Sequence, residues 1–153
     1  MENVISRRLL LKHSWKASEW LVFIINSLCI FLFIYTAYAK ITDYTTFKHG
    51  LSRLAFLGSY SGYIAWLIPV SEIIIATLLL IPRTVKYGLI AFTSLMTLFT
   101  SYLIAVMLSN QELPCSCGGV IQSMSWPQHI WFNLAFIVLG TTAIFIIQSK
   151  KIF

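Results

Sequence analysis

Four windows of this sequence are long and apolar enough to cross a lipid bilayer as helices, which takes about 20 residues each. The windows cover residues 20–39, 63–81, 88–108 and 130–147. Glu72 is the only formally charged residue inside any of them. The composition agrees, since 58% of the residues are hydrophobic and 10% are charged, against about 45–50% and about 25% in soluble domains. We therefore predict an all-α membrane protein, a single domain folded as a four-helix transmembrane bundle over residues 1–153.

The positions of the basic residues predict how the bundle crosses the membrane. A net charge of +6 is also typical of nucleic-acid binders, but these residues do not form one cluster. They lie at the ends of the apolar windows, where Lys and Arg mark the cytoplasmic side. Most of the 11 lie on one side, in the N-terminal segment, the second connection or the tail: Arg7, Arg8, Lys12, Lys16, Arg83, Lys86, Lys150 and Lys151. Both termini are therefore predicted to be cytoplasmic, and the third connection, residues 109–129, to face outward.

The first window also has features of a cleaved signal peptide. Basic residues precede it, and Ala37-Tyr38-Ala39 resembles a signal-peptidase site. However, the apolar core of a signal peptide runs over about 7–15 residues, whereas this window has about 20. We therefore expect the first helix to be retained.

The connections between the windows carry their own patterns. In the first, Tyr44, Phe47, Leu51 and Leu54 recur at helical spacing, which predicts a short amphipathic helix on the outer side. The second connection, residues 82–87, is so short that the second and third windows must form an antiparallel hairpin. At the start of the fourth, Ser125 and Gln128 have the spacing of a helix N-cap and its capping-box partner.

Two thiols one residue apart stand in the third connection, as Cys115-Ser116-Cys117. A disulfide between residues i and i+2 closes a very small ring and stores strain, and strained, exposed disulfides tend to be labile or catalytic. Gly118 and Gly119 follow directly and permit the close approach of a partner. We interpret Cys115 and Cys117 as a redox pair. A static staple is less favoured, because so small a loop gains little chain entropy from closure.

A metal site is the alternative for the same segment. Two thiolates with His129 and Met124 would form a soft donor set suited to Cu(I). Zinc would need a fourth ligand, and none is evident. His129 also has a plainer interpretation, as an interfacial residue near the start of the fourth helix. We predict no resident metal and keep copper handling as a separate hypothesis.

Glu72 is the second candidate, because a carboxylate within a membrane span is costly unless it is protonated or paired. Its candidate partners lie toward the outer half: Lys40, Arg53, Tyr35, Tyr38, Tyr102 and Asn133. Glu72 either fixes the helix packing or acts as a proton acceptor beside a quinone or thiol site. The third cysteine, Cys29, is expected to be a small buried hydrophobe, and Asn26 to form a hydrogen bond between helices.

With these residues in view, the chain resembles the DoxX-like membrane proteins, and among them the MauE (methylamine-utilisation) branch. The resemblance extends over roughly residues 20–147. It rests on three segments: Tyr38-Ala39-Lys40-Ile41-Thr42-Asp43 followed by Phe47, then Pro69-Val70-Ser71-Glu72, then Cys115-Ser116-Cys117-Gly118-Gly119. The MauE pattern is Cys-x-Cys-Phe-Gly, so Gly118 stands here in place of the Phe. The resemblance implies a four-helix protein of the bacterial inner membrane that is associated with periplasmic redox work.

Three hypotheses about function follow. In the first, the outward-facing cysteine pair exchanges thiol and disulfide with a periplasmic or membrane partner, and Glu72, Lys40 and His129 support it. Re-oxidation would come from a membrane quinone near Glu72 or from a thioredoxin-like domain. The second is a non-catalytic subunit or assembly factor of a larger complex, and the third is copper handling. Whether the chain is an enzyme, a possible thiol–disulfide oxidoreductase, and whether methylamine metabolism is involved both stay open.

Overall fold

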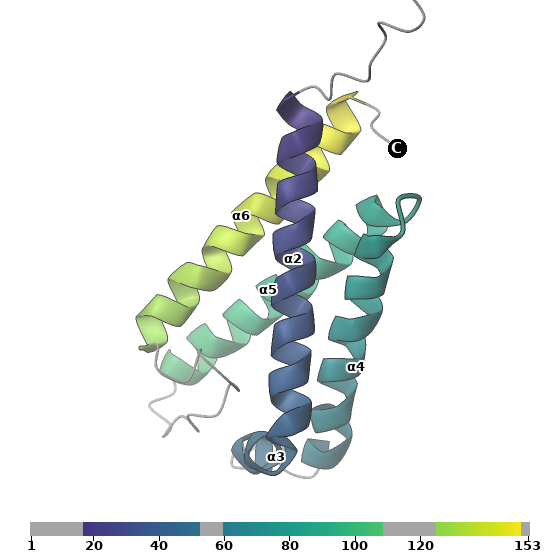
Figure 1. Ribbon diagram of the computed structural model, residues 1–153. Coiled ribbons are helices and arrows are strands. Elements are labelled where there is room, and N and C mark those ends of the chain that lie inside the picture. Colours follow the sequence, from purple (N-terminus) through teal and green to yellow (C-terminus); the bar gives the residue numbers. More distant parts are fainter. Residues whose placement is uncertain (1–16, 53–59, 109–124, 151–153) are drawn as a thin grey trace, which may run out of the picture.

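The computed structural model describes residues 17–52, 60–108 and 125–150, and these residues form five α-helices without a strand. The helices are α2 (Ala17–Thr42), α3 (Tyr44–Ser52), α4 (Ser61–Leu80), α5 (Val85–Leu108) and α6 (Trp126–Lys150), shown in Figure 1. All but α3 are long and apolar enough to cross a membrane. The chain is therefore a multi-pass helical membrane protein, as predicted.

Each predicted window falls on one long helix, and the helices extend a few residues beyond most window ends. Windows follow hydropathy, whereas a helix continues into polar residues as long as its backbone hydrogen bonds continue. The difference matters at Lys40, which lies in the last turn of α2 rather than in a loop. The backbone of Lys40 therefore has a defined position on α2.

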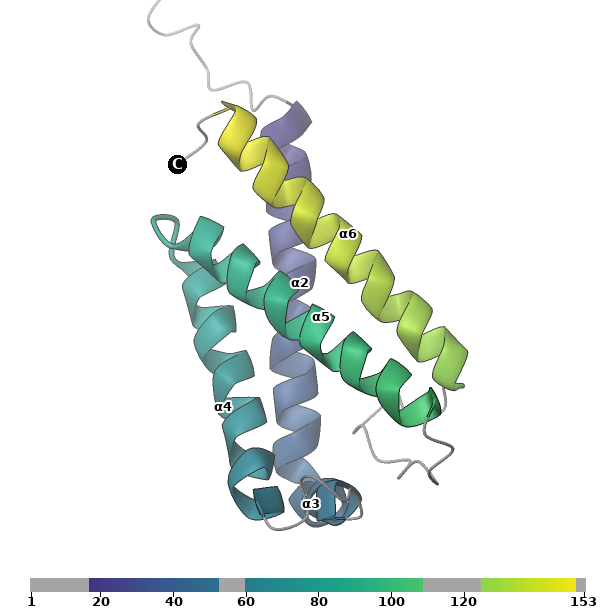
Figure 2. The same ribbon diagram turned by 180° about the vertical axis from the view of Figure 1, so that it is seen from behind.

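The four long helices are arranged so that α2 packs against α4 and α6, and α5 packs against the same two helices from the other side. Helices α4 and α5 form the predicted antiparallel hairpin, joined by a turn at residues 81–84. We call the end that holds this turn the hairpin end. At the opposite end, the α3 end, α3 lies across the foot of α2 and α4 (Figures 1 and 2). Helix α5 ends and α6 begins at the α3 end as well.

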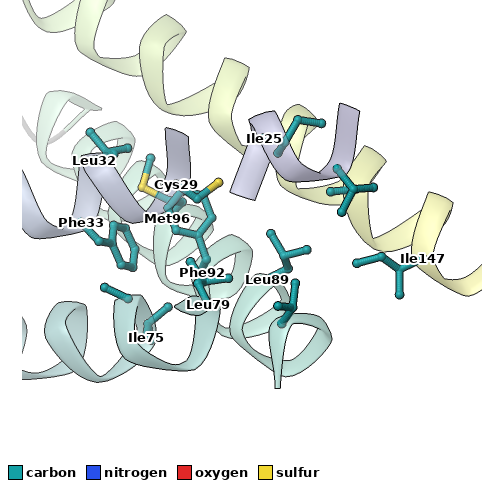
Figure 3. Close-up of a cluster of buried hydrophobic side chains, with 14 residues drawn as sticks. Ile25, Cys29, Leu32, Phe33, Ile75, Leu79, Leu89, Phe92, Met96 and Ile147 are labelled. Carbon is teal, nitrogen blue, oxygen red and sulfur yellow. The ribbon is translucent and has the colours of Figure 1, made fainter. Parts of the chain in front are cut away.

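The main hydrophobic core fills the half of the bundle nearer the hairpin end, and all four long helices contribute to it. Figure 3 shows these side chains converging between the helices. The rings of Phe33 and Phe92 lie 4.4 Å apart between their centroids, and Phe92, Phe132 and Phe136 continue the aromatic contacts onto α6. We call these four phenylalanines the aromatic layer.

Helices α5 and α6 approach each other closely at Gly140. A Cβ atom added to Gly140 would lie 2.5 Å from Thr93 Oγ1. The Thr93 hydroxyl is itself fixed, because it donates a hydrogen bond to the carbonyl oxygen of Leu89 at 2.8 Å. Small residues allow close helix contacts of this kind in membranes, where lipid is as apolar as the protein interior.

Helix α3 confirms the predicted amphipathic helix, and it packs on the bundle rather than lying free. Its buried residues Phe47 and Leu51 contact Ala65 of α4, with Tyr44 and Tyr102 beside them. Leu54, the last residue of the predicted apolar stripe, lies outside the described residues.

The outer surface of the long helices is strongly apolar. Side chains such as Phe31, Leu67, Leu98 and Phe145 are more than 60% exposed, and at most 33% of the residues in each span's most apolar window are buried inside the structure. An apolar surface of this extent suits lipid rather than water.

Candidate functional site

Lys40 of α2 and Glu72 of α4 form an ion pair inside the bundle. Lys40 Nζ lies 2.7 Å from Glu72 Oε1, and the two side chains are 12% and 2% exposed. The sequence places both residues among the candidates, and the structure selects Lys40 as the partner. Of the alternatives that the sequence leaves for Glu72, the structure shows pairing with a donor inside the bundle.

The surroundings of Lys40 suit a buried cation. Its ammonium lies 3.5 Å from the carbonyl oxygen of Thr36, one turn earlier on α2. The rings of Phe47 on α3 and Phe99 on α5 each have their centroid 6.0 Å from Nζ, at the limit for a cation–π interaction. Lys40 therefore contacts or approaches groups on four helices, and we call the region around it the polar layer.

The two oxygens of the Glu72 carboxyl differ in their hydrogen bonding. Oε2 is buried, and no described residue donates a hydrogen bond to it. Thr36 lies next to this carboxyl, but its hydroxyl donates to the carbonyl oxygen of Phe33 at 3.3 Å. A buried acceptor without a donor is costly, and Glu72 Oε2 is one of three buried side-chain atoms without a hydrogen-bond partner among the described residues, with Ser18 Oγ and Asn26 Oδ1.

His129 joins this region from α6. It lies in the first turn of the helix, where its backbone N–H donates to the Ser125 carbonyl oxygen at 3.0 Å. Gln128 Oε1 accepts a hydrogen bond from the Ser125 N–H at 2.9 Å, which confirms the capping-box partner. The His129 side chain is half-buried and lies within electrostatic reach of Lys40. The structure thus brings Lys40 and Glu72 into contact and places His129 within electrostatic reach of Lys40.

The cysteine pair and its two glycines, Cys115, Cys117, Gly118 and Gly119, lie outside the described residues, as does Met124. The described chain stops at Leu108 and resumes at Ser125, at the α3 end of the bundle. The polar layer lies in the half of the bundle nearer that end. Among the residues that the structure describes, no group of three or more His, Cys, Asp or Glu side chains could hold a metal ion.

Cys29 and Asn26 occupy the other half of the bundle. Cys29 is fully buried in the main hydrophobic core, as Figure 3 shows. Eleven residues of helix separate it from Lys40, or about 16 Å along the axis. Asn26 Nδ2 donates a hydrogen bond to the Leu79 carbonyl oxygen at 3.0 Å, the predicted bond between helices. Both residues therefore have structural roles, and neither belongs to the polar layer.

Phe99, Phe47 and Thr36 line the site, although the sequence does not single them out as site residues. A helical wheel could have found Thr36, which is four residues before Lys40 and on the same face of α2. The approach of Phe99 depends on how α5 packs against α2 and α4, so no local pattern indicates it.

The family comparison gives one match. A family model described as "Methylamine utilisation protein MauE" matches residues 18–146, which include Lys40, Glu72 and His129. No curated protein sequence and no solved structure matches the chain significantly. The broader DoxX-like grouping stays a prediction.

Proposed function

We infer the function from the premise that the chain belongs to the MauE family, whose model matches most of its length. We propose that this membrane protein exchanges thiol and disulfide with a partner protein through Cys115 and Cys117. Support comes from the Cys-x-Cys-Gly-Gly segment, which joins α5 to α6. The single observation that carries the proposal is that this segment starts and ends on the half of the bundle that holds the polar layer.

The chemistry is a pair of exchange steps. A thiolate of the partner attacks one sulfur of the Cys115–Cys117 disulfide, whose S–S bond breaks as the new mixed disulfide forms. The released cysteine of this chain leaves as a thiolate and can attack the mixed disulfide in return. Oxidation of the partner requires instead that its second thiolate makes that attack. The partner then leaves with a disulfide, and both cysteines here are left reduced.

We propose that the α3 end faces the periplasm of a bacterial cell and that both termini are cytoplasmic. Arg83 and Lys86 lie at or beside the turn of the hairpin end, and the N-terminus of α2 and the C-terminus of α6 lie toward that end too. Short connections rich in Lys and Arg stay on the cytoplasmic side. Disulfides persist on the other side, where the compartment is oxidising.

A second candidate function is a non-catalytic subunit or assembly factor. The outer face of α3 favours it, because Thr45, Thr46, Lys48 and His49 are exposed there across the end of the bundle. A partner that binds this polar face would need no thiol chemistry.

Single and double Cys→Ser variants separate the two functions. Cys115→Ser and Cys117→Ser are made singly and together, with Cys29→Ser as the matched control. If the pair exchanges disulfides, one single variant accumulates a mixed disulfide with the partner, which mass spectrometry of the cross-linked species identifies. The double variant then leaves the partner reduced in cells. Unchanged partner oxidation with the double variant would contradict the proposal and favour the assembly role.

A further inference from the structure

The unpaired carboxyl oxygen in the polar layer indicates a ligand. Glu72 is 1% exposed, yet Oε2 accepts no hydrogen bond from any described residue. The groups beside it are Thr36 and Lys40, and His129 lies within electrostatic reach of Lys40. The site therefore combines one free acceptor, the Glu72 Oε2 atom, with the ammonium of Lys40 and the ring of His129.

We propose that this polar layer binds the head group of a membrane quinone in its oxidised and reduced forms. A quinone presents two carbonyl oxygens, which need donors such as the Lys40 ammonium or a His129 N–H. The hydroquinone presents two hydroxyls, and one of them donates to Glu72 Oε2. Few other lipid-soluble molecules need donors in one redox state and an acceptor in the other.

The surroundings also suit a flat, lipid-soluble ring. Lys40 and Glu72 lie on helices that are long and apolar enough to span the bilayer, and the Lys40 side chain is the more exposed of the two, at 12%. The Phe47 and Phe99 rings flank the ammonium, and ring stacking stabilises aromatic ligands.

The inference deepens the proposed function, on which its redox step rests. The chain contains three cysteines, and Cys29 is buried in the main hydrophobic core, so a second disulfide cannot re-oxidise Cys115 and Cys117 from within. In the balanced step, the two thiols lose two protons and two electrons and form one S–S bond. The quinone takes up both electrons and both protons and becomes hydroquinone.

The experiment measures binding of a short-chain hydroquinone, kept reduced under anaerobic conditions, to the purified full-length chain in nanodiscs by isothermal titration calorimetry. Glu72→Gln removes the charged acceptor, and Glu19→Gln is the matched control at the opposite end of α2. Loss of a hydrogen bond to a charged group corresponds to about ten- to a hundredfold weaker binding. Because Glu72→Gln leaves Lys40 unpaired, a Lys40→Gln/Glu72→Gln double variant shows whether the loss of binding persists when no unpaired charge remains.

We expect both Glu72 variants to bind the hydroquinone at least about tenfold more weakly than the wild type and Glu19→Gln. Equal affinity in all four proteins would mean simple partition into lipid and would overturn the site. A Cys115→Ser/Cys117→Ser variant should bind normally but fail to reduce the quinone. If binding depends on Glu72 while the reduced wild type transfers no electrons to quinone, the site stands and the proposed cysteine chemistry fails.

Discussion

Lys40 and Glu72 join α2 to α4 through a 2.7 Å contact between Nζ and Oε1 in the interior of the bundle. Removing one partner leaves the other charge buried and uncompensated, whereas removing both does not. The two residues should therefore be strongly coupled energetically.

We expect Lys40→Met or Glu72→Gln alone to lower the free energy of unfolding by about 3 kcal/mol, and the double variant to lower it by much less. Thermal unfolding in detergent measures all three, with Lys48→Met as the control for an exposed lysine on α3. Additive effects of the two single changes would show that the contact does not stabilise the fold.

Gly140 should be intolerant of even one methyl group. Its added Cβ would lie 2.5 Å from Thr93 Oγ1, and overpacking of this kind costs about 1–3 kcal/mol. Gly140→Ala should lower the melting temperature, and a Thr93→Ala/Gly140→Ala double variant should recover much of the loss. Gly62→Ala is the control, because the nearest atom to a Cβ there is Lys48 Cε at 3.8 Å. A melting temperature unaffected by Gly140→Ala would contradict the close approach of α5 and α6.

The start of α6 should depend on Gln128. Its side chain accepts the Ser125 N–H at 2.9 Å, and loss of a cap costs about 0.5–1 kcal/mol. Gln128→Ala should speed amide hydrogen exchange at Ser125 and in the first turn of α6, while Gln128→Glu keeps the acceptor and the slow exchange. Equal exchange in Gln128→Ala and the wild type would exclude a capping role.

The cysteine pair should react from outside the cytosol. After mild reductant, a membrane-impermeant maleimide should label Cys115 and Cys117 on intact spheroplasts, and a Cys115→Ser/Cys117→Ser variant should not be labelled. Cys29 is buried and should stay unlabelled in both. Labelling that requires lysis would place the pair in the cytosol and reverse the proposed orientation.

The helices and their order are predictable from sequence because each helix is determined by residues close together in the chain. Four apolar windows, a connection too short for anything but a hairpin, and the spacing of Phe47 and Leu51 each determine one element without reference to the rest. The capping pair Ser125 and Gln128 is local in the same sense, since three residues separate the interacting groups.

The site is only partly predictable, because its geometry comes from packing between helices. A lone carboxylate within an apolar window requires a donor, and Lys40 is among the candidates. Its selection depends on how α2 and α4 align, as the position of Phe99 depends on α5. The roles of Cys115, Cys117, Gly118 and Gly119 stay predictions, since these residues lie outside the described part of the chain.

The aromatic layer has an electrical consequence for the cell. A buried ion pair stabilises water and protons in the interior of a membrane span. Phe33, Phe92 and Phe136, with the rest of the main hydrophobic core behind them, separate this point from the hairpin end. Between Lys40 and the hairpin end lies a cluster of buried apolar side chains contributed by all four long helices. We expect this apolar half to let the protein keep Lys40 and Glu72 within the bilayer without conducting ions across it.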